Sequence, residues 1–218
     1  MKINAIIEKE RSMRWIFFSI SLLALSVIFS QCAKKETADT RLTPEEEKRV
    51  VAFSDSLANQ LVQTLVTELA KAMQEGGPEN AISVCNLKAL PLTAEVARMH
   101  GESVDIKRTT RKYRNPKNAP DEREKAALAY FEQKIQAGKL PPYYVQKFKN
   151  QGQPVYRYYK PLKVAQVCLN CHGDAKTISP AVQKKLQALY PEDRATGYKE
   201  GDFRGVIRIE IRKPLESE

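Results

Sequence analysis

Hydrophobic positions recur every three or four residues from residue 43 to residue 75. The apolar stripe consists of Val50, Phe53, Leu57, Leu61, Leu65 and Leu69. This spacing predicts one amphipathic helix. Thr43 and Pro44 are typical of a helix start, and Gly76-Gly77-Pro78 predicts where the helix ends. A helix over 43–75 is long enough to extend past a small domain, so we expect it to form a stalk or a homodimer contact.

Two further helices are predicted after this break. One begins at Pro78, places Cys85 on an apolar face and ends near Gly101. Leu90-Pro91 predicts a bend or a restart within it, because proline cannot donate a helical hydrogen bond. The other covers residues 121–137, where helical spacing resumes after a turn-rich stretch.

Alternating patterns predict strands in the rest of the chain. Residues 104–110 form one, and residues 143–148 and 154–159 form a hairpin around a five-residue loop. In residues 204–211 isoleucines alternate with charged residues, which predicts a half-buried antiparallel strand with its charges in solvent. Helices first and an antiparallel sheet later predict an α+β fold.

The N-terminus carries an export signal. Residues 15–30 are sixteen positions without a charge and follow several basic residues. A membrane-spanning helix usually needs about 20 apolar residues, so this length favours a cleaved signal over an uncleaved anchor. The segment ends at Cys32 and resembles a bacterial lipoprotein signal, in which that cysteine is acylated. We therefore expect a signal peptide over 1–32, a tether over 33–42 and a periplasmic lipoprotein held at a membrane surface, with a plain cleaved signal as the alternative.

Charge and composition exclude some functions. The formal net charge is +10, but basic and acidic residues are interleaved, which indicates solvated faces and not a nucleic-acid groove. The chain has only two histidines, His100 and His172, which excludes zinc sites built from several histidines. With four cysteines and two histidines in total, each position carries information.

Residues 168–172 read Cys-Leu-Asn-Cys-His, the C-x-x-C-H pattern of c-type haem attachment. Two thiols at this spacing can form thioethers with the two vinyl groups of one porphyrin, and the next residue is placed to bind the iron. The pattern predicts one covalent haem c on Cys168 and Cys171, with His172 as the proximal iron ligand. An export signal favours the same prediction, because such haems are attached outside the bacterial inner membrane.

Two alternatives remain for these cysteines. Cys168 and Cys171 are spaced like a redox disulfide, although such pairs usually open a helix in a thioredoxin-like setting. Together with Cys85 and His172 they are also a possible Cys3His zinc set, although adjacent ligands suit tetrahedral geometry poorly.

The second axial position of a haem has few candidates in this sequence. They are Met73, Cys85, Met99, His100 and the lysines. Met73 and Met99 are typical core residues, and His100 is placed to cap a helix. Cys85 is a lone cysteine on an apolar helix face, either as a ligand or as a small buried hydrophobe.

Five segments in order resemble one protein family. They are 81–85 (AISVC), 108–120 (RTTRKYRNPKNAP), 154–156 (PVY), 168–173 (CLNCHG) and 190–205 (YPEDRATGYKEGDFRG). They are similar to a family of exported c-haem domains with a PAS-like fold, found alone or as the sensor part of histidine kinases and methyl-accepting receptors. The resemblance spans about residues 50–211. It departs at Thr110, where serine is common.

The resemblance implies a PAS-like antiparallel sheet flanked by helices over residues 43–213, followed by a short tail over 214–218. It also implies His172 as proximal ligand and Cys85 as distal thiolate. Arg111, Arg114 and Asn115 are candidates to contact haem propionates, with a purely structural turn as the alternative.

A thiolate ligand that weakens on reduction predicts a redox or small-gas sensor. The alternative is an electron-transfer cytochrome or an accessory haem subunit of a respiratory complex. An enzyme is not expected, because His100 is the sole candidate for distal acid–base chemistry.

Overall fold

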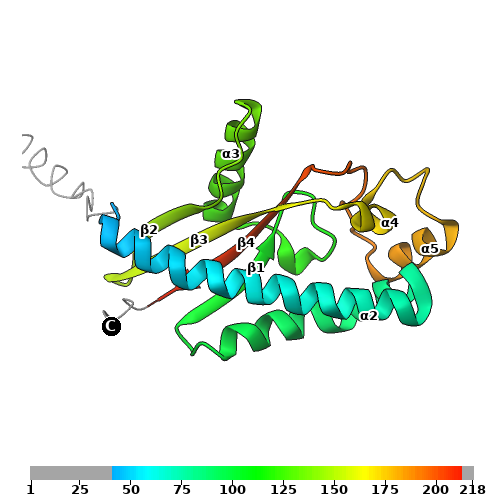
Figure 1. Cartoon of the computed structure of the whole chain (residues 1–218), viewed down its shortest axis with the longest axis horizontal. Helices are drawn as coiled ribbons and strands as arrows, with labels where there is room; N and C mark the ends of the chain where they lie inside the picture. Colours follow the sequence, from blue (N-terminus) through cyan, green and yellow to red (C-terminus); the bar gives the residue numbers. More distant parts are fainter. Residues whose placement is uncertain (1–40, 213–218) are drawn as a thin grey trace, which may run out of the picture. The chain divides into compact units, whose positions relative to one another are not determined.

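A helical hairpin begins the folded part of the chain. The computed structural model describes residues 41–212, and its first element, α2, spans Pro44–Arg98 (Figure 1). Gly76 and Gly77 leave the helical conformation, and Gly77 has a φ of 66°. Glycine adopts this φ readily, so the pair can reverse the chain. The arms 44–75 and 78–98 therefore lie antiparallel, with Lys88 donating to Glu68 across them at 2.8 Å.

The remaining elements form one sheet with helices on both faces. In chain order they are β1 (Val104–Thr109), η2 (Pro116–Asn118), α3 (Glu122–Gln136), β2 (Tyr144–Asn150), β3 (Gln153–Lys163), η3 (Gln166–Cys168), α4 (Leu169–His172), α5 (Pro180–Leu189) and β4 (Phe203–Ile211). The four strands are antiparallel in the order β1-β4-β3-β2. The predicted α+β class and long N-terminal helix are confirmed, whereas the PAS-like likeness stays a prediction.

The start of α2 is the predicted one, but its second arm differs from expectation. Thr43 and Glu46 form a reciprocal capping box at the N-terminus. The helix does not restart at Leu90-Pro91, because within α2 the backbone leaves helical geometry only at the two glycines. Packing at both ends of the arm, at Ile82 and at Val96, holds the helix through the proline.

The predicted hairpin is present with a shorter loop. β2 and β3 pair up to Asn150 and Gln153, which leaves Gln151 and Gly152 as the turn. Both turn residues have positive φ, at 50° and 78°. A two-residue turn of this kind matches the twist of paired strands, so pairing continues into the stretch predicted as loop.

One face of the sheet packs on the first arm of α2. Its isoleucines on β4 meet the helix stripe in a single apolar cluster. The fully buried members include Leu57, Ala58, Leu61, Tyr158, Ile207, Ile209 and Ile211. The apolar stripe of the first arm is therefore buried against the sheet of the same chain. A homodimer through the 43–75 helix stays a prediction, and its contacts would have to come from other positions, such as Val66, which is 56% exposed.

The charged positions of β4 do not face solvent, which corrects the half-buried strand predicted for residues 204–211. Arg208 and Glu210 are only 5% and 7% exposed, because α3 covers this face. Arg208 pairs with Glu124 of α3 at 3.2 Å and with Asp105 at 2.6 Å. Arg157 pairs with Glu210 at 2.6 Å. The alternation marks a strand buried on both faces, with ion pairs beneath a helix.

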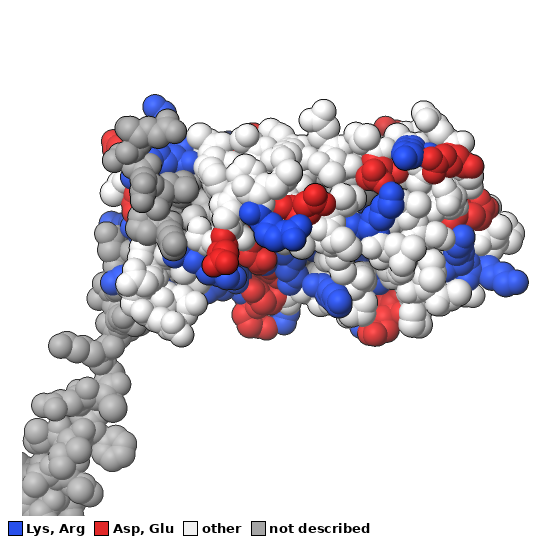
Figure 2. All heavy atoms as spheres, turned by 90° about the horizontal axis from the view of Figure 1, so that it is seen from below, with Lys and Arg blue, Asp and Glu red and all other residues white. Residues whose placement is uncertain are grey.

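None of the helices within residues 41–212 has the length and apolar content needed to cross a membrane. On the face shown in Figure 2, basic and acidic side chains are interspersed with uncharged ones. The predicted signal peptide over 1–32, the tether over 33–42, apart from its last two residues, and the tail over 214–218 lie outside the described residues.

Glu46 joins α2 to the hairpin of β2 and β3. Its carboxylate accepts hydrogen bonds from the Thr43 backbone N–H at 2.9 Å, the Tyr156 hydroxyl at 2.7 Å and Lys147 at 2.9 Å. These donors, led by the backbone N–H, lower the pKa of Glu46 from its ordinary value of 4.5 to about 2.

We expect Glu46→Gln to reduce the free energy of unfolding by about 2 kcal/mol at neutral pH. A lowered pKa stabilises the fold above the unfolded value, so the difference should be full above pH 4.5 and disappear as the pH falls toward 2. Denaturant titrations at several pH values measure it. Glu45→Gln is the matched control, because Glu45 shares the first turn but is exposed. An equal loss in both variants would contradict this role.

Candidate functional site

The C-x-x-C-H segment forms a short helical connection between β3 and α5. Cys168 ends η3, and Cys171 and His172 lie on α4. All three residues are half-buried. Gly173 closes the turn by donating its N–H to the Leu169 carbonyl at 3.0 Å. A Cβ at Gly173 would lie 2.7 Å from that oxygen, so a residue with a side chain would displace the turn that carries His172.

The imidazole of His172 is held in one orientation. Its Nδ1 lies 2.6 Å from the carbonyl oxygen of Ala195 and donates its proton to it. In this tautomer Nε2 carries a lone pair that can bind a metal. Desolvation, followed by the positive charges of Arg114 and Arg204, lowers the pKa of His172 to about 3. A neutral imidazole with one nitrogen tied to a carbonyl is the usual form of a metal ligand.

A second segment supports the histidine from the side. The backbone N–H of Tyr198 donates to the His172 carbonyl at 3.0 Å, and that of Gly197 donates to the Gly173 carbonyl at 2.7 Å. The Tyr198 ring lies edge-on to the imidazole, with centroids 6.4 Å apart. Residues 195–198 therefore hold both the imidazole ring and the backbone carbonyl of His172.

Cys85 approaches the same place from the second arm of α2. This arm packs on α5 through an apolar cluster of Ile82, Ile178, Val182, Leu186 and Tyr190, and Cys171 lies against that cluster. Burial by surrounding atoms raises the pKa of the Cys85 thiol, and Arg108 and Arg114 oppose the rise. Burial also raises the pKa of Cys171, with Cys85 and Cys168 among the charges that act on it. The structure thus brings Cys85 to the C-x-x-C-H segment, where the residue as a whole is still exposed.

The three predicted propionate contacts separate in the structure. Arg114 lies at the site, where it donates to Asp193 at 3.0 Å and to the Cys171 carbonyl at 2.6 Å. Arg111 instead pairs with Glu132 of α3 at 2.8 Å. Asn115 caps η2 by accepting from Lys117 at 3.0 Å. Arg111 and Asn115 have structural partners, and their contact with a haem stays a prediction.

Sequence reasoning missed two arginines at the site. Arg108, on β1, has a buried Nε with no hydrogen-bond partner. Arg204, on β4, donates to the Lys112 carbonyl at 3.1 Å and lies over the Tyr198 ring. Alternation along β1 was the available signal, because Arg108 follows Val104 and Ile106 on the face that packs on α2.

The two other readings of the cysteines gain no support. Among the described residues, no group of three or more His, Cys, Asp or Glu side chains is arranged to hold a metal ion. Cys85, Cys168 and Cys171 each carry a free thiol. Cys32, the predicted lipidation site, lies outside the described residues. His100 is exposed just after the end of α2 and contacts the first arm, with its Nε2 3.2 Å from Gln60 Oε1.

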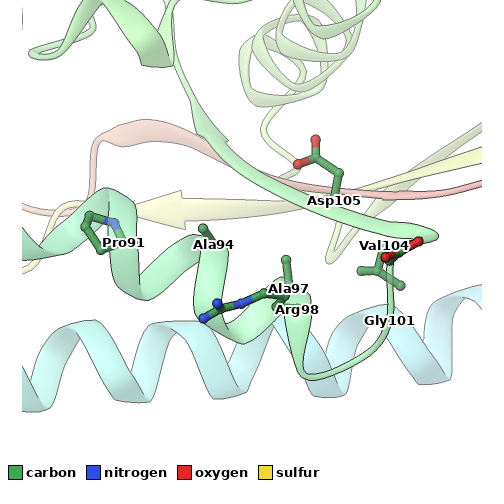
Figure 3. Close-up of a pocket in the computed structure, with 8 residues that line it drawn as sticks. Pro91, Ala94, Ala97, Arg98, Gly101, Val104 and Asp105 are labelled. Atoms are coloured by element: carbon green, nitrogen blue, oxygen red, sulfur yellow. The ribbon is translucent and has the colours of Figure 1, made fainter.

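A separate hollow lies at the other end of β1. It has a volume of about 510 Å³ and is lined by the second arm of α2 and the start of β1, including Pro91, Ala94, Ala97, Arg98, Val104 and Asp105 (Figure 3). Cys85, Cys168, Cys171 and His172 are not among its lining residues. Its Asp105 is paired with Arg208. The hollow therefore offers no alternative arrangement of the predicted site residues.

A protein family and a solved structure match this chain. The family model named Tll0287-like matches residues 33–212. The structure is similar to a solved one titled "Crystal structure of the cyanobacterial heme-protein Tll0287", with 27% identity, a TM-score of 0.53, and coverage of 81% of this chain and 100% of that chain. No curated protein matches the chain. Because the family model covers most of the sequence, this chain belongs to the Tll0287-like family.

Proposed function

We propose that the chain is a haem protein that carries one haem c on Cys168 and Cys171, with His172 and Cys85 as axial ligands. The single observation that carries the proposal is the convergence of Cys85 with the C-x-x-C-H segment from a distant part of the sequence. When bound, a haem supplies a redox-active iron that can also take a small gas molecule. The solved relative named a heme protein supports the same cofactor.

The residues of the site fit such a group. His172 offers Nε2 because Nδ1 is committed to Ala195. Cys85 carries a free thiol on an exposed residue, and although burial raises the pKa of that thiol, Arg108 and Arg114 offset part of the rise. The buried Nε of Arg108 without a partner indicates that the site accommodates an acceptor from outside the chain.

We further propose that the domain acts as a redox or small-gas sensor. Cys85 lies on the second arm of α2, and the first arm covers the sheet. The glycine pair at 76–77 connects the two arms, which also touch through Lys88 with Glu68 and through Val96, packed in the same apolar cluster as the first arm. A change in what Cys85 binds would act directly on this arm, which supplies the two-state element that a switch requires. The predicted export signal and Cys32 support a periplasmic, membrane-anchored location.

An electron carrier is the second candidate. Val167, next to Cys168, is 50% exposed, so the attachment segment lies near the surface. A haem there would be accessible to a redox partner. The carrier requires Cys85 to remain bound in both oxidation states, and this requirement separates the two candidates.

We expect the full chain, made in a host able to mature c-type cytochromes, to gain the mass of one haem. The double variant Cys168→Ala/Cys171→Ala should gain none, because both thioether donors are removed. Intact mass and the alkaline pyridine haemochrome spectrum measure this. Cys85→Ala is the control, since it leaves both attachment thiols. A colourless wild-type chain without added mass would rule out the haem proposal.

We expect Cys85→Ala to retain covalent haem but to lose the absorption bands of thiolate ligation. Its reduction potential should rise, because a thiolate stabilises ferric iron. Spectroelectrochemistry measures both effects. Leu87→Ala is the matched control, because Leu87 lies on the same arm and is 72% exposed. An unchanged spectrum in Cys85→Ala would show that another residue supplies the second axial ligand.

We expect the reduced wild-type protein to bind CO and its second α2 arm, residues 78–98, to exchange amide hydrogens faster. Loss of the Cys85 bond would loosen that arm. Absorption spectra and hydrogen exchange in both oxidation states measure this. The first arm, which is buried against the sheet, is the internal control. Six-coordinate reduced haem that takes no CO would favour the electron carrier.

A further inference from the structure

The candidate site contains more buried positive charge than its own carboxylates balance. Arg108, Arg114 and Arg204 act electrostatically on one another or on the same neighbours. Among the described residues, Asp193 is the carboxylate in contact with this group, and it pairs with Arg114. Burying unpaired charge is costly, so a fold that keeps two such guanidiniums requires a compensating anion.

Arg108 is the least compensated of the three arginines. Its Nε–H is buried and donates to no acceptor among the described residues. Desolvation is the main cause that lowers the pKa of its guanidinium, and the groups that act on it electrostatically are Cys85, Arg204 and Tyr190. None of these is a carboxylate. Arg108 therefore faces the cysteine ligand without an acidic residue beside it.

Arg204 reaches the same side of the sheet through an irregularity in β4. Val206 and Phe203 both pack in the cluster under α3, although strict alternation would place them on opposite faces. The slip occurs at Gly205, which has a φ of 140°, and β3 shows a matching register shift at Leu162. Arg204 is thereby turned toward Tyr198 and His172.

We propose that Arg108 and Arg204 form the carboxylate-binding part of this site and hold the two carboxylate groups of the bound porphyrin. This inference rests on the proposed function, since it concerns the same cofactor. Two guanidiniums match the two negative charges of a dicarboxylic porphyrin. Arginine is suited to the task because its planar fork binds carboxylates in a bidentate manner.

Arg114 has a different task. Its Nε is committed to Asp193 and its terminal nitrogen to the Cys171 carbonyl, at 3.0 and 2.6 Å. It therefore ties the C-x-x-C-H turn to residues 193–195 and is electrically paired. Arg108 and Arg204, which have no carboxylate partner among the described residues, are therefore the arginines assigned to the bound porphyrin.

The test uses non-covalent binding to the full chain carrying Cys168→Ala and Cys171→Ala, which keeps His172 and Cys85. This parent is titrated with haemin and with haemin dimethyl ester, whose carboxylates are blocked. We expect the parent to bind haemin about tenfold to a hundredfold more tightly than the ester, from the loss of charge-assisted hydrogen bonds. Adding Arg108→Met or Arg204→Met should weaken haemin binding and reduce that preference.

Arg123→Met in the same parent is the matched control, because Arg123 is an exposed arginine on α3 that lies over the Phe148 ring of the hairpin. It should keep the full preference for haemin. Equal binding of haemin and ester by the parent would overturn the assignment, and so would an undiminished preference in both Met variants. A parent that binds neither porphyrin, together with a wild-type chain that acquires no haem, would overturn the proposed function itself.

Stability without porphyrin gives an independent measurement. Arg108→Met removes a buried guanidinium whose Nε has no partner, so the thermal midpoint of the porphyrin-free parent should stay equal or rise. Weaker haemin binding with undiminished stability marks a ligand-binding residue. A lowered midpoint in both Met variants, with haemin and ester affinities falling alike, would instead show a structural role and overturn the proposal.

Discussion

The reversal of α2 at Gly76 and Gly77 is the constraint on which the candidate site depends. It returns the chain along its own first arm and delivers Cys85 to a segment more than eighty positions later in the sequence. Without the reversal, a continuous helix would carry Cys85 away from His172 at about 1.5 Å per residue. The positive φ of Gly77 is therefore as important to the site as any residue within it.

The two faces of the sheet solve the burial problem differently. The α2 face is apolar, and the α3 face carries a network in which Glu124, fully buried, is held by Lys107 and Arg208. Such pairs contribute little net stability, but removing one partner would leave a charge without compensation. The network thus fixes where α3 lies. The apolar face continues past Ile106 to Arg108, where the core ends and the site begins.

Local chemistry was predictable, and spatial convergence was not. The C-x-x-C-H segment, the capping box at Thr43 and the glycine break all follow from neighbouring residues. A helix-stop motif does not specify the angle between the helices on either side of it, so the antiparallel packing of the two arms could not be predicted. Cys85 was assigned to the candidate site only because of the family resemblance. A lone cysteine on a helix face is equally typical of a hydrophobic core.

Side-chain direction explains the remaining differences. Arg111 and Arg114 are three positions apart, yet one faces α3 and the other faces Cys171. The alternating charges of β4 look the same whether water or a helix covers them, which is why Arg208 and Glu210 were placed in solvent. The side of the sheet on which Arg204 lies could not be predicted from strand alternation. The irregularity at Gly205 that changes the alternation is visible only in the backbone geometry.

The position of β4 bears on how the chain is assembled. β4 is the last described strand in sequence, yet it lies between β1 and β3. A polypeptide that emerges from its N-terminus can form the β2–β3 ribbon early, but the sheet stays in two pieces until β4 has arrived. Cys168 and Cys171 precede β4, so their thiols are delivered while the domain is still open. If the haem is attached as proposed, this order of synthesis gives the attachment machinery an interval in which no finished fold shields the two thiols.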